Sequence, residues 1–243
     1  MKSKLLRFIL PFCFWIFIWW LGASILDNSF LFPNVDETII ALIDLIVKPS
    51  FYLVVLLTTT RVLLGFLFGC ALGFVLAILC NKFSVLEALI TPIITIIKAT
   101  PVASFIVLLW VMLSGDALSV FIGFLMVMPI IWQNTMDAFS SIDKNLIEVA
   151  EIFEFSSKKK FKLLILPTLK TFLYPAIITS AGLAWKAEIA AEIIAYTKLS
   201  IGQGINDAKY NMDTPTVFAW TMLIILFSIL LELGTKKLLR RFK

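Results

Sequence analysis

The stretch that decides the fold is DKNLIEVAEIFEFSSKKKFKLLILP, residues 143–167, the longest polar interruption in a very apolar chain. It carries five lysines and four acids, and its apolar residues recur at the spacing of an amphipathic helix. Hydrophobic segments long enough to cross a bilayer lie on both sides of it. Lysine-rich loops between membrane spans are typical of the cytoplasmic side. The stretch therefore predicts a folded cytoplasmic loop of short helices that serves as a docking surface for a second protein.

The composition outside this loop is that of a membrane protein. Of the 243 residues, 60% are hydrophobic and 15% are charged, and the mean hydropathy is +1.00. A soluble domain of this length has about 45–50% apolar and about 25% charged residues. The net charge of +5 does not indicate nucleic-acid binding, because the lysines and arginines lie at the ends of hydrophobic runs. We expect one transmembrane domain over residues 1–243, multi-pass in the inner or plasma membrane of the cell.

Six spans are expected in an all-α membrane protein. The third hydrophobic stretch contains Pro92 and Pro101, so it should be kinked or split. Residues 31–48 predict a short amphipathic helix at the outer interface, and residues 196–213 predict an outer loop. The expected spans cover residues 8–25, 53–80, 85–113, 117–132, 168–195 and 214–233.

The distribution of positive charge orients these spans. Fourteen of the 21 lysines and arginines fall in segments that six spans place inside, and three fall in segments placed outside. Both termini and the loop of about residues 138–167 are therefore expected to be cytoplasmic. Lys2, Lys4, Arg7, Lys144 and Lys243 are among the inside charges.

The second span carries a pattern of small residues. Gly65, Gly69 and Gly73 recur every four residues and lie on one helix face. In a bilayer this spacing favours the close approach of a neighbouring helix. Arg61, near the outer end of the same span, is expected either to reach outward to water or to pair with an acid.

Charged side chains inside the spans are the candidates for a translocation pathway, because charges facing lipid are costly. Glu188 and Glu192 share one face of the fifth span, with Trp185 and Lys186 beside them. The alternative is that these charges form interhelical ion pairs with a packing role only. Their signs do not decide whether the pathway prefers anions. At the break in the third stretch, Lys98 and Thr100 are either pathway residues or interfacial residues after a turn.

Chemistry of several kinds is not indicated by the sequence. There is no histidine, and the three cysteines lie in or beside apolar runs without the spacing of a metal site. No G-x-x-x-x-G-K-[ST] loop is present, so ATP would have to be hydrolysed by another chain. We expect no metal, no cofactor in this chain and no enzymatic activity. An intramembrane enzyme built on Glu188 and Glu192 is a weaker alternative.

The central loop is similar to the EAA loop of permease subunits in binding-protein-dependent ABC importers. That pattern is E-A-A, three residues, G, nine residues and I-x-L-P. Here Glu148-Val149-Ala150 is followed at the same spacing by Glu154 and by Leu164-Ile165-Leu166-Pro167, with Glu154 replacing the glycine. Residues 60–65, 98–101, 182–186 and 191–192 resemble the nitrate/sulfonate/taurine branch of this family.

The resemblance implies a type I importer permease (MetI-like) fold that forms the pathway for a small solute, such as nitrate, a sulfonate, taurine or a vitamin precursor. It implies cytoplasmic ABC ATPase subunits that bind ATP and Mg, an extracytoplasmic substrate-binding protein and a second permease, by default a copy of this chain. A secondary transporter without an ATPase is the alternative. The resemblance assigns ATPase coupling to Glu148, Val149, Ala150, Glu151, Phe153, Glu154, Leu166 and Pro167.

Overall fold

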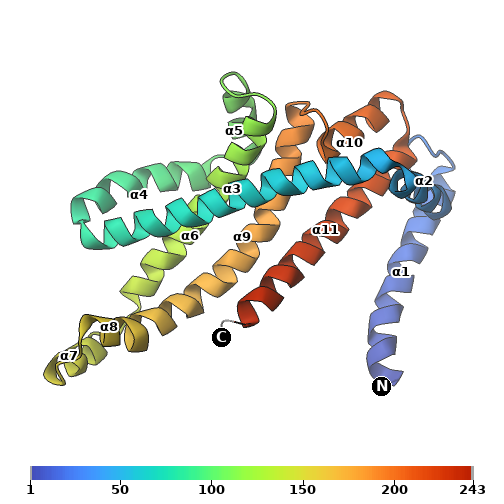
Figure 1. Ribbon diagram of the computed structural model, residues 1–243. Coiled ribbons are helices and arrows are strands. Elements are labelled where there is room, and N and C mark those ends of the chain that lie inside the picture. Colours follow the sequence, from blue (N-terminus) through green and yellow to red (C-terminus); the bar gives the residue numbers. More distant parts are fainter. Residues whose placement is uncertain (1, 242–243) are drawn as a thin grey trace.

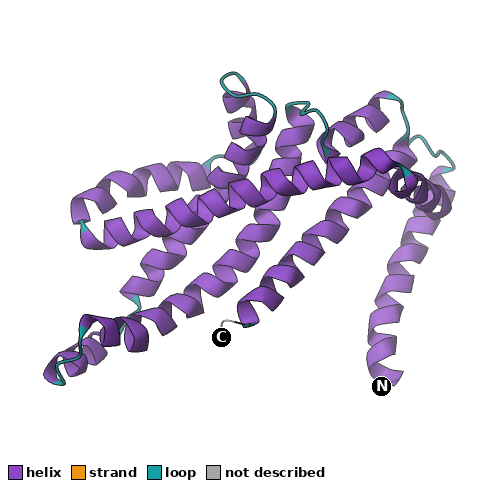
Figure 2. Cartoon of the chain, viewed as in Figure 1, coloured by secondary structure: helices purple, strands orange, loops and turns teal. Residues whose placement is uncertain are grey.

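The computed structural model describes the backbone of residues 2–241, and their side chains except those of residues 2–8, 12 and 144. The side chains of Lys2, Lys4, Arg7, Lys144 and Lys243, counted above as inside charges, lie outside this description. Every regular element in the described chain is helical (Figure 2). The elements are α1 (Lys2–Leu26), α2 (Val35–Val47), α3 (Pro49–Lys82), α4 (Ser84–Ala99), α5 (Val102–Trp110), α6 (Asp116–Ser140), α7 (Lys144–Ile152), α8 (Ser157–Lys160), the π-helix η1 (Phe161–Ile165), α9 (Leu166–Ile194), α10 (Ile201–Tyr210) and α11 (Thr214–Arg240).

Five helical segments of the described chain are long and apolar enough to cross a membrane: α1, α3, α6, α8 to α9 taken together, and α11. The expected third span is a broken pair, in which α4 and α5 are bent by 102°. The break lies at Thr100 and Pro101, because proline lacks a backbone donor and holds the preceding Thr100 in an extended conformation. The predicted split is confirmed there, whereas Pro92 lies inside α4.

Helix α6 is the centre of the fold and packs along α3 on one side and α9 on the other. Helix α11 packs on α9, and the main core lies where these helices meet, around Trp185, Ile189 and Trp220. Helix α1 stands apart from the bundle along most of its length (Figure 1). It is held near its C-terminal end, where Trp19 Nε1 donates a hydrogen bond to the Pro33 carbonyl oxygen at 3.0 Å.

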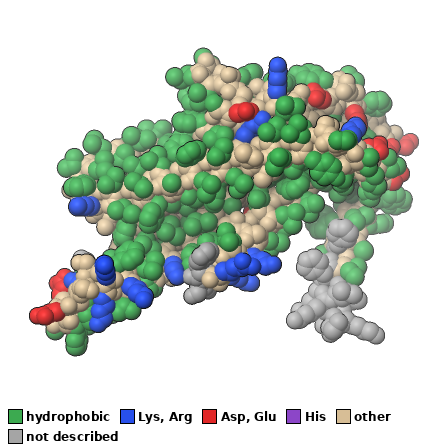
Figure 3. All heavy atoms as spheres, viewed as in Figure 1, with side chains coloured by type: hydrophobic (Ala, Val, Ile, Leu, Met, Phe, Trp, Pro, Cys, Tyr) green, Lys and Arg blue, Asp and Glu red, His purple; other side chains and the backbone are tan. Residues whose placement is uncertain are grey.

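The molecule has two distinct ends (Figure 1). Helices α7 and α8 lie at one end, here called the loop end, together with the N-terminal end of α1 and the C-terminal end of α11. Helices α2, α5 and α10 lie at the other, here called the outer end because the charge distribution predicts that it faces away from the cytoplasm. Figure 3 shows Lys and Arg side chains gathered at the loop end, with hydrophobic side chains covering most of the surface between the two ends.

The two short outer segments differ in how well the sequence predicts them. The amphipathic helix expected within residues 31–48 is α2. The segment expected as an outer loop, residues 196–213, connects α9 to α11 and contains a helix that the sequence analysis did not predict, α10 at Ile201–Tyr210. The cause is an N-cap: Ser200 Oγ accepts a hydrogen bond from the Gln203 backbone N–H at 2.9 Å. Serine followed three residues later by glutamine is a helix-start pattern, so the signal was present in the sequence.

Candidate functional site

Helix α7 presents apolar side chains that the rest of the described chain leaves about half exposed or more. Asp143 starts the helix, and its Oδ1 accepts a hydrogen bond from the Asn145 backbone N–H at 2.8 Å. Ala150 is buried, but Ile152 is 77% exposed and Phe153 is 70% exposed. We call the exposed set the α7 apolar face: Leu146, Val149, Ile152 and Phe153. Glu148 is exposed on the same helix.

A tight turn ends α7 at the position where the EAA pattern has glycine. Glu154 adopts a φ of +50°, the left-handed conformation that favours glycine. The Phe155 N–H bonds the Ala150 carbonyl oxygen, and the Glu154 N–H bonds the Glu151 carbonyl oxygen, both at 2.9 Å. This pair of bonds is a Schellman motif. The turn that glycine would favour therefore forms with glutamate in its place.

The rest of the loop is folded onto this turn and joined directly to α9. Lys160 Nζ lies 3.1 Å from Glu151 Oε1, and Lys159 Nζ lies 3.8 Å from the centre of the Phe155 ring. The π-helix η1 follows α8, with the Leu166 N–H bonded to the Phe161 carbonyl oxygen. Leu166 and the exposed Pro167 begin α9. One continuous helical segment thus runs from Ser157 to Ile194.

A buried ion pair joins α3 and α9 at the outer end. Arg61 Nη1 lies 3.0 Å from Glu192 Oε1, and both side chains are almost completely buried. The guanidinium also contacts Asp116 on α6, at 2.8 Å from Nη2 and 2.9 Å from Nε. Its remaining bonds, at 3.3 Å, go to the carbonyl oxygens of Lys198 and Leu199. Of the two outcomes expected for Arg61, the structure shows pairing with acids.

The Glu192 carboxylate also holds the N-terminus of α10. Thr58 Oγ1 donates to Glu192 Oε1 at 2.9 Å, and the Gly202 backbone N–H donates to Oε2 at 3.3 Å. The Ile201 N–H donates to Thr58 Oγ1 at 3.1 Å. A Cβ at Gly202 would lie 2.5 Å from the Glu192 Cβ, so α9 and α10 approach closely here. Helices α3, α6, α9 and α10 thus share one hydrogen-bonded cluster at the outer end.

Glu188 lies one helical turn from Glu192 and has a different environment. Its side chain is fully buried, and neither carboxyl oxygen has a hydrogen-bond partner in the described chain. The carboxyl group fills a notch between Gly65 on α3 and Gly123 on α6, where a Cβ on either glycine would collide with it. A buried carboxyl group without hydrogen bonds costs several kcal/mol.

The remaining predicted pathway residues do not join this cluster. Trp185 is fully buried and donates from Nε1 to the Ile224 carbonyl oxygen of α11 at 3.0 Å. Lys186 and Lys98 are exposed, and Thr100 Oγ1 donates to the Ile96 carbonyl oxygen of its own helix. Within the described side chains, no hydrogen bond or ion pair links these residues to Glu188 or Glu192.

The glycines of α3 lie against α6. A Cβ at Gly69 would lie 2.7 Å from Val127 Cβ, and a Cβ at Gly73 would lie 2.5 Å from the Met128 carbonyl oxygen. At Gly65 the corresponding neighbours are Glu188 and the Val120 carbonyl oxygen. The three positions therefore lie where the backbones of α3 and α6 approach most closely.

Sequence reasoning missed three members of the outer cluster, Thr58, Asp116 and Gly202. Asp116 follows Gly115 in a polar turn, and nothing local marks it as the partner of an arginine 55 residues away. The available signal was Arg61 itself, because a buried arginine requires acceptors. Gly202 could not be found from an expected loop, since its amide acts as part of the α10 N-terminus.

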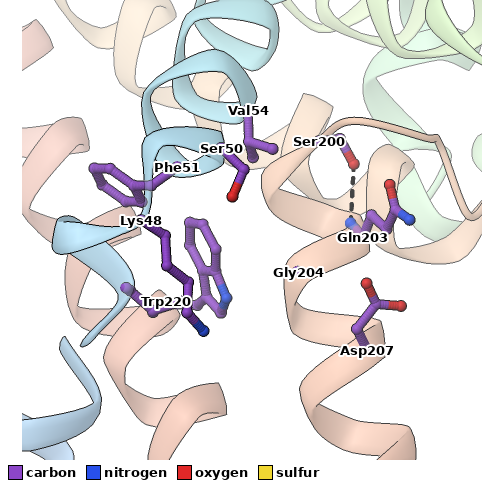
Figure 4. Close-up of a pocket in the computed structure, with 10 residues that line it drawn as sticks. Lys48, Ser50, Phe51, Val54, Ser200, Gln203, Gly204, Asp207 and Trp220 are labelled. Carbon is purple, nitrogen blue, oxygen red and sulfur yellow. Dashed lines mark hydrogen bonds between the residues drawn. The ribbon is translucent and has the colours of Figure 1, made fainter. Parts of the chain in front are cut away.

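A small pocket opens at the outer end between the N-terminal part of α3, α10, α2 and α11, with a volume of about 250 Å³. Figure 4 shows Lys48 alongside the Trp220 ring, and Asp207 and Gln203 on the neighbouring helix α10. Lys48 and Asp207 are exposed, whereas Trp220 is buried. The pocket presents groups of both charges next to an aromatic wall.

Comparison with known proteins identifies the family of this chain. Residues 65–243 match the family model described as "Binding-protein-dependent transport system inner membrane component". The putative aliphatic sulfonates transport permease of Bacillus subtilis (strain 168) is 25% identical over 210 residues, which cover 86% of this chain and 74% of that protein. The taurine transport system permease of Escherichia coli (strain K12) is 22% identical over 231 residues, or 92% and 84% of the two chains. A bicarbonate transport system permease of Synechococcus elongatus is 27% identical over 150 residues, or 61% and 54%.

Proposed function

The chain belongs to the family of inner-membrane components of binding-protein-dependent transport systems, and we propose that helix α7 is its contact with the ATPase that drives transport. It is a multi-pass membrane protein and the permease subunit of an ABC transporter. Members of this family act with an ATPase and a substrate-binding protein. For this chain we propose the surface that contacts the ATPase, the number of permease subunits in the transporter and the class of solute.

The observation that carries the proposal is the exposure of the α7 apolar face at the loop end. Phe153 and Ile152 are each at least 70% exposed on a short, capped helix that projects beyond the spans (Figure 1). A helix with exposed apolar residues at this spacing fits an apolar groove of a partner protein. Glu148, Glu151 and Glu154 border this face and would set the orientation of the contact.

Movement of the loop would be transmitted to the spans without a flexible joint. The segment from Ser157 to Ile194 is continuously helical, so a displacement of α7 and α8 acts directly on α9. In the proposed mechanism, ATP and Mg are bound by the partner ATPase, and closure of its dimer moves α7. The spans then alternate between inward-facing and outward-facing arrangements.

We infer that two copies of this chain enclose the pathway and that a substrate-binding protein delivers the solute at the outer end. The solute class is proposed from the relatives, whose names specify aliphatic sulfonates, taurine and bicarbonate. Sulfonates, taurine and bicarbonate all carry an oxyanion group. A small solute bearing such a group is therefore the first class to test.

The test is uptake into proteoliposomes that contain the chain with its ATPase, supplied with the binding protein and with labelled oxyanion solutes. Uptake should require ATP on the side of the membrane where the ATPase is bound. It should be lost when the catalytic glutamate of the ATPase is replaced. Uptake by the chain alone, driven by an ion gradient without ATP, would instead establish a secondary transporter.

A further inference from the structure

The buried carboxyl group of Glu188 has no hydrogen-bond partner among the described residues, although a buried arginine lies one helical turn away along α3. Arg61 and Gly65 are four residues apart on α3, and Glu192 and Glu188 are four residues apart on α9. Arg61 contacts Glu192, and Gly65 contacts Glu188. Both helices therefore present matching positions at an interval of one turn, but in the observed register only one of the two acids meets the arginine.

We propose that α9 has a second position, one helical turn further toward the outer end, in which Glu188 replaces Glu192 as the partner of Arg61. This inference rests on the proposed function, because it concerns how movement of the loop reaches the outer end. A shift by four residues along an α-helix is about 6 Å. One-turn displacements of one packed helix past another are a known form of switching between two states.

The sequence of α9 permits such a shift because its buried face repeats every four residues. Ala184, four residues before Glu188, is fully buried and small enough to occupy the notch that Glu188 would leave between Gly65 and Gly123. Most other buried positions on this helix are also small. These positions are Ala176, Ser180, Ala181, Gly182, Ala187 and Ala191. The exceptions are Leu169, Trp185 and Ile189, and the shift has to move Trp185 along α11 and break its bond to the Ile224 carbonyl oxygen.

The shift also gives the second buried acid a role. Breaking a buried ion pair is costly because it leaves an uncompensated charge inside the protein. In the second position Arg61 would keep a carboxylate partner, while Glu192 would move toward water at the outer end. The N-terminus of α10, held by Glu192 and Thr58, would then be released. The same step would thus open the outer end and preserve the charge pairing of Arg61.

The loop is connected so that it can drive this movement. Helix α9 continues without a break through η1 and α8, and α7 is tied to α8 by the Lys160–Glu151 ion pair, so a force on α7 is passed to the end of the α9 segment. Helices α3 and α6 are held together by the close contacts at Gly69 and Gly73. They form a fixed pair past which α9 can move.

The experiment measures two distances between spin labels in the complete transporter reconstituted in nanodiscs, with the three native cysteines replaced. Labels at the exposed Lys82 on α3 and Lys162 on η1 report the position of α9. Labels at Lys82 and the exposed Ser140 report the α3–α6 pair and serve as the control. Trapping the ATPase with ATP and vanadate should change the first distance by up to about 6 Å, the length of one helical turn, and leave the second unchanged.

Two matched substitutions then identify the acids that hold each position. Glu188→Gln should reduce the population of the shifted position under vanadate, because the amide is a poor replacement for a carboxylate beside Arg61. Glu192→Gln should have the opposite effect and populate the shifted position without nucleotide. A merely structural role for the two acids would lower the stability of both variants without moving these populations in opposite directions.

The outcomes separate the inference from the proposed function. If ATP drives uptake but the first distance does not change, or if it changes equally in wild type and in Glu188→Gln, the two-position account of α9 is overturned and the ABC permease function stands. If the ATPase does not associate with the chain and ATP does not support uptake, the proposed function itself fails.

Discussion

Arg61 on α3 and Glu192 on α9, 131 residues apart in sequence, form a buried ion pair with Nη1 and Oε1 separated by 3.0 Å. The pair fixes where these two helices cross, and through Asp116 and Gly202 it includes α6 and α10. Removing one partner of a buried pair leaves the other charge uncompensated.

Arg61→Met should destabilise the protein strongly, by about 3–5 kcal/mol, because Glu192 would stay buried without its cation. Asp116→Asn should have a much smaller effect, about 0–1 kcal/mol, since the Asp116 side chain is 75% exposed. The measurement is the thermal unfolding midpoint of each purified variant in one detergent. Equal midpoints for the two variants would show that the buried pair does not hold the outer end together.

The glycine contacts predict a rescue that depends on position. Gly123→Ala should destabilise by about 1–3 kcal/mol, because the new Cβ would collide with the Glu188 carboxyl group. Adding Glu188→Ala should restore the stability of Gly123→Ala by removing the colliding group. Gly73→Ala should also destabilise, since its Cβ would lie 2.5 Å from the Met128 carbonyl oxygen, but Glu188→Ala should not rescue it.

Gly234→Ala is the matched control for this series, because nothing lies within 4 Å of a Cβ at that position of α11. It should be neutral or stabilising by up to about 1 kcal/mol, the helix-propensity difference. If this control lost as much stability as Gly123→Ala, the effect at Gly123 could not be assigned to the collision with Glu188.

Glu154→Gly should stabilise the turn after α7 by about 1 kcal/mol, because glycine adopts a φ of +50° without the steric cost of a Cβ. Glu154→Ala should give no such gain, which separates the backbone effect from loss of the carboxylate. The measurement is hydrogen exchange of the Phe155 amide, which bonds the Ala150 carbonyl oxygen in this turn. Slower exchange in the alanine variant than in the glycine variant would contradict this account of the turn.

The sequence predicted best those features of the fold that the membrane and the local backbone determine. Apolar length predicts the long helices, and Pro101 predicts the break between α4 and α5, because both follow from local properties of the backbone. The spacing of residues 148–167 indicates the family, and residues 65–243 match its model. These features need no knowledge of which helices pack together.

The arrangement of the charges could not be predicted in the same way. The pairing of Arg61 with Glu192 and Asp116 depends on how three helices cross, which no local pattern specifies. For the same reason the sequence analysis did not distinguish Glu188 from Glu192. The structure shows that Glu192 is hydrogen-bonded, whereas Glu188 has no hydrogen-bond partner in the described chain. Trp185 was grouped with them by sequence proximity, yet its side chain faces α11.

The measurement that tests the central claim most directly is retention of the ABC ATPase subunit by the tagged chain during purification of the co-expressed complex. Wild type should retain the ATPase in stoichiometric amount. Phe153→Asp, which places a charge on the α7 apolar face, and Glu148→Arg should lose it. Phe30→Asp, the same change at a residue 71% exposed in the loop between α1 and α2, should retain it. Equal retention by wild type, Phe153→Asp and Glu148→Arg would contradict the assignment of α7 as the coupling helix.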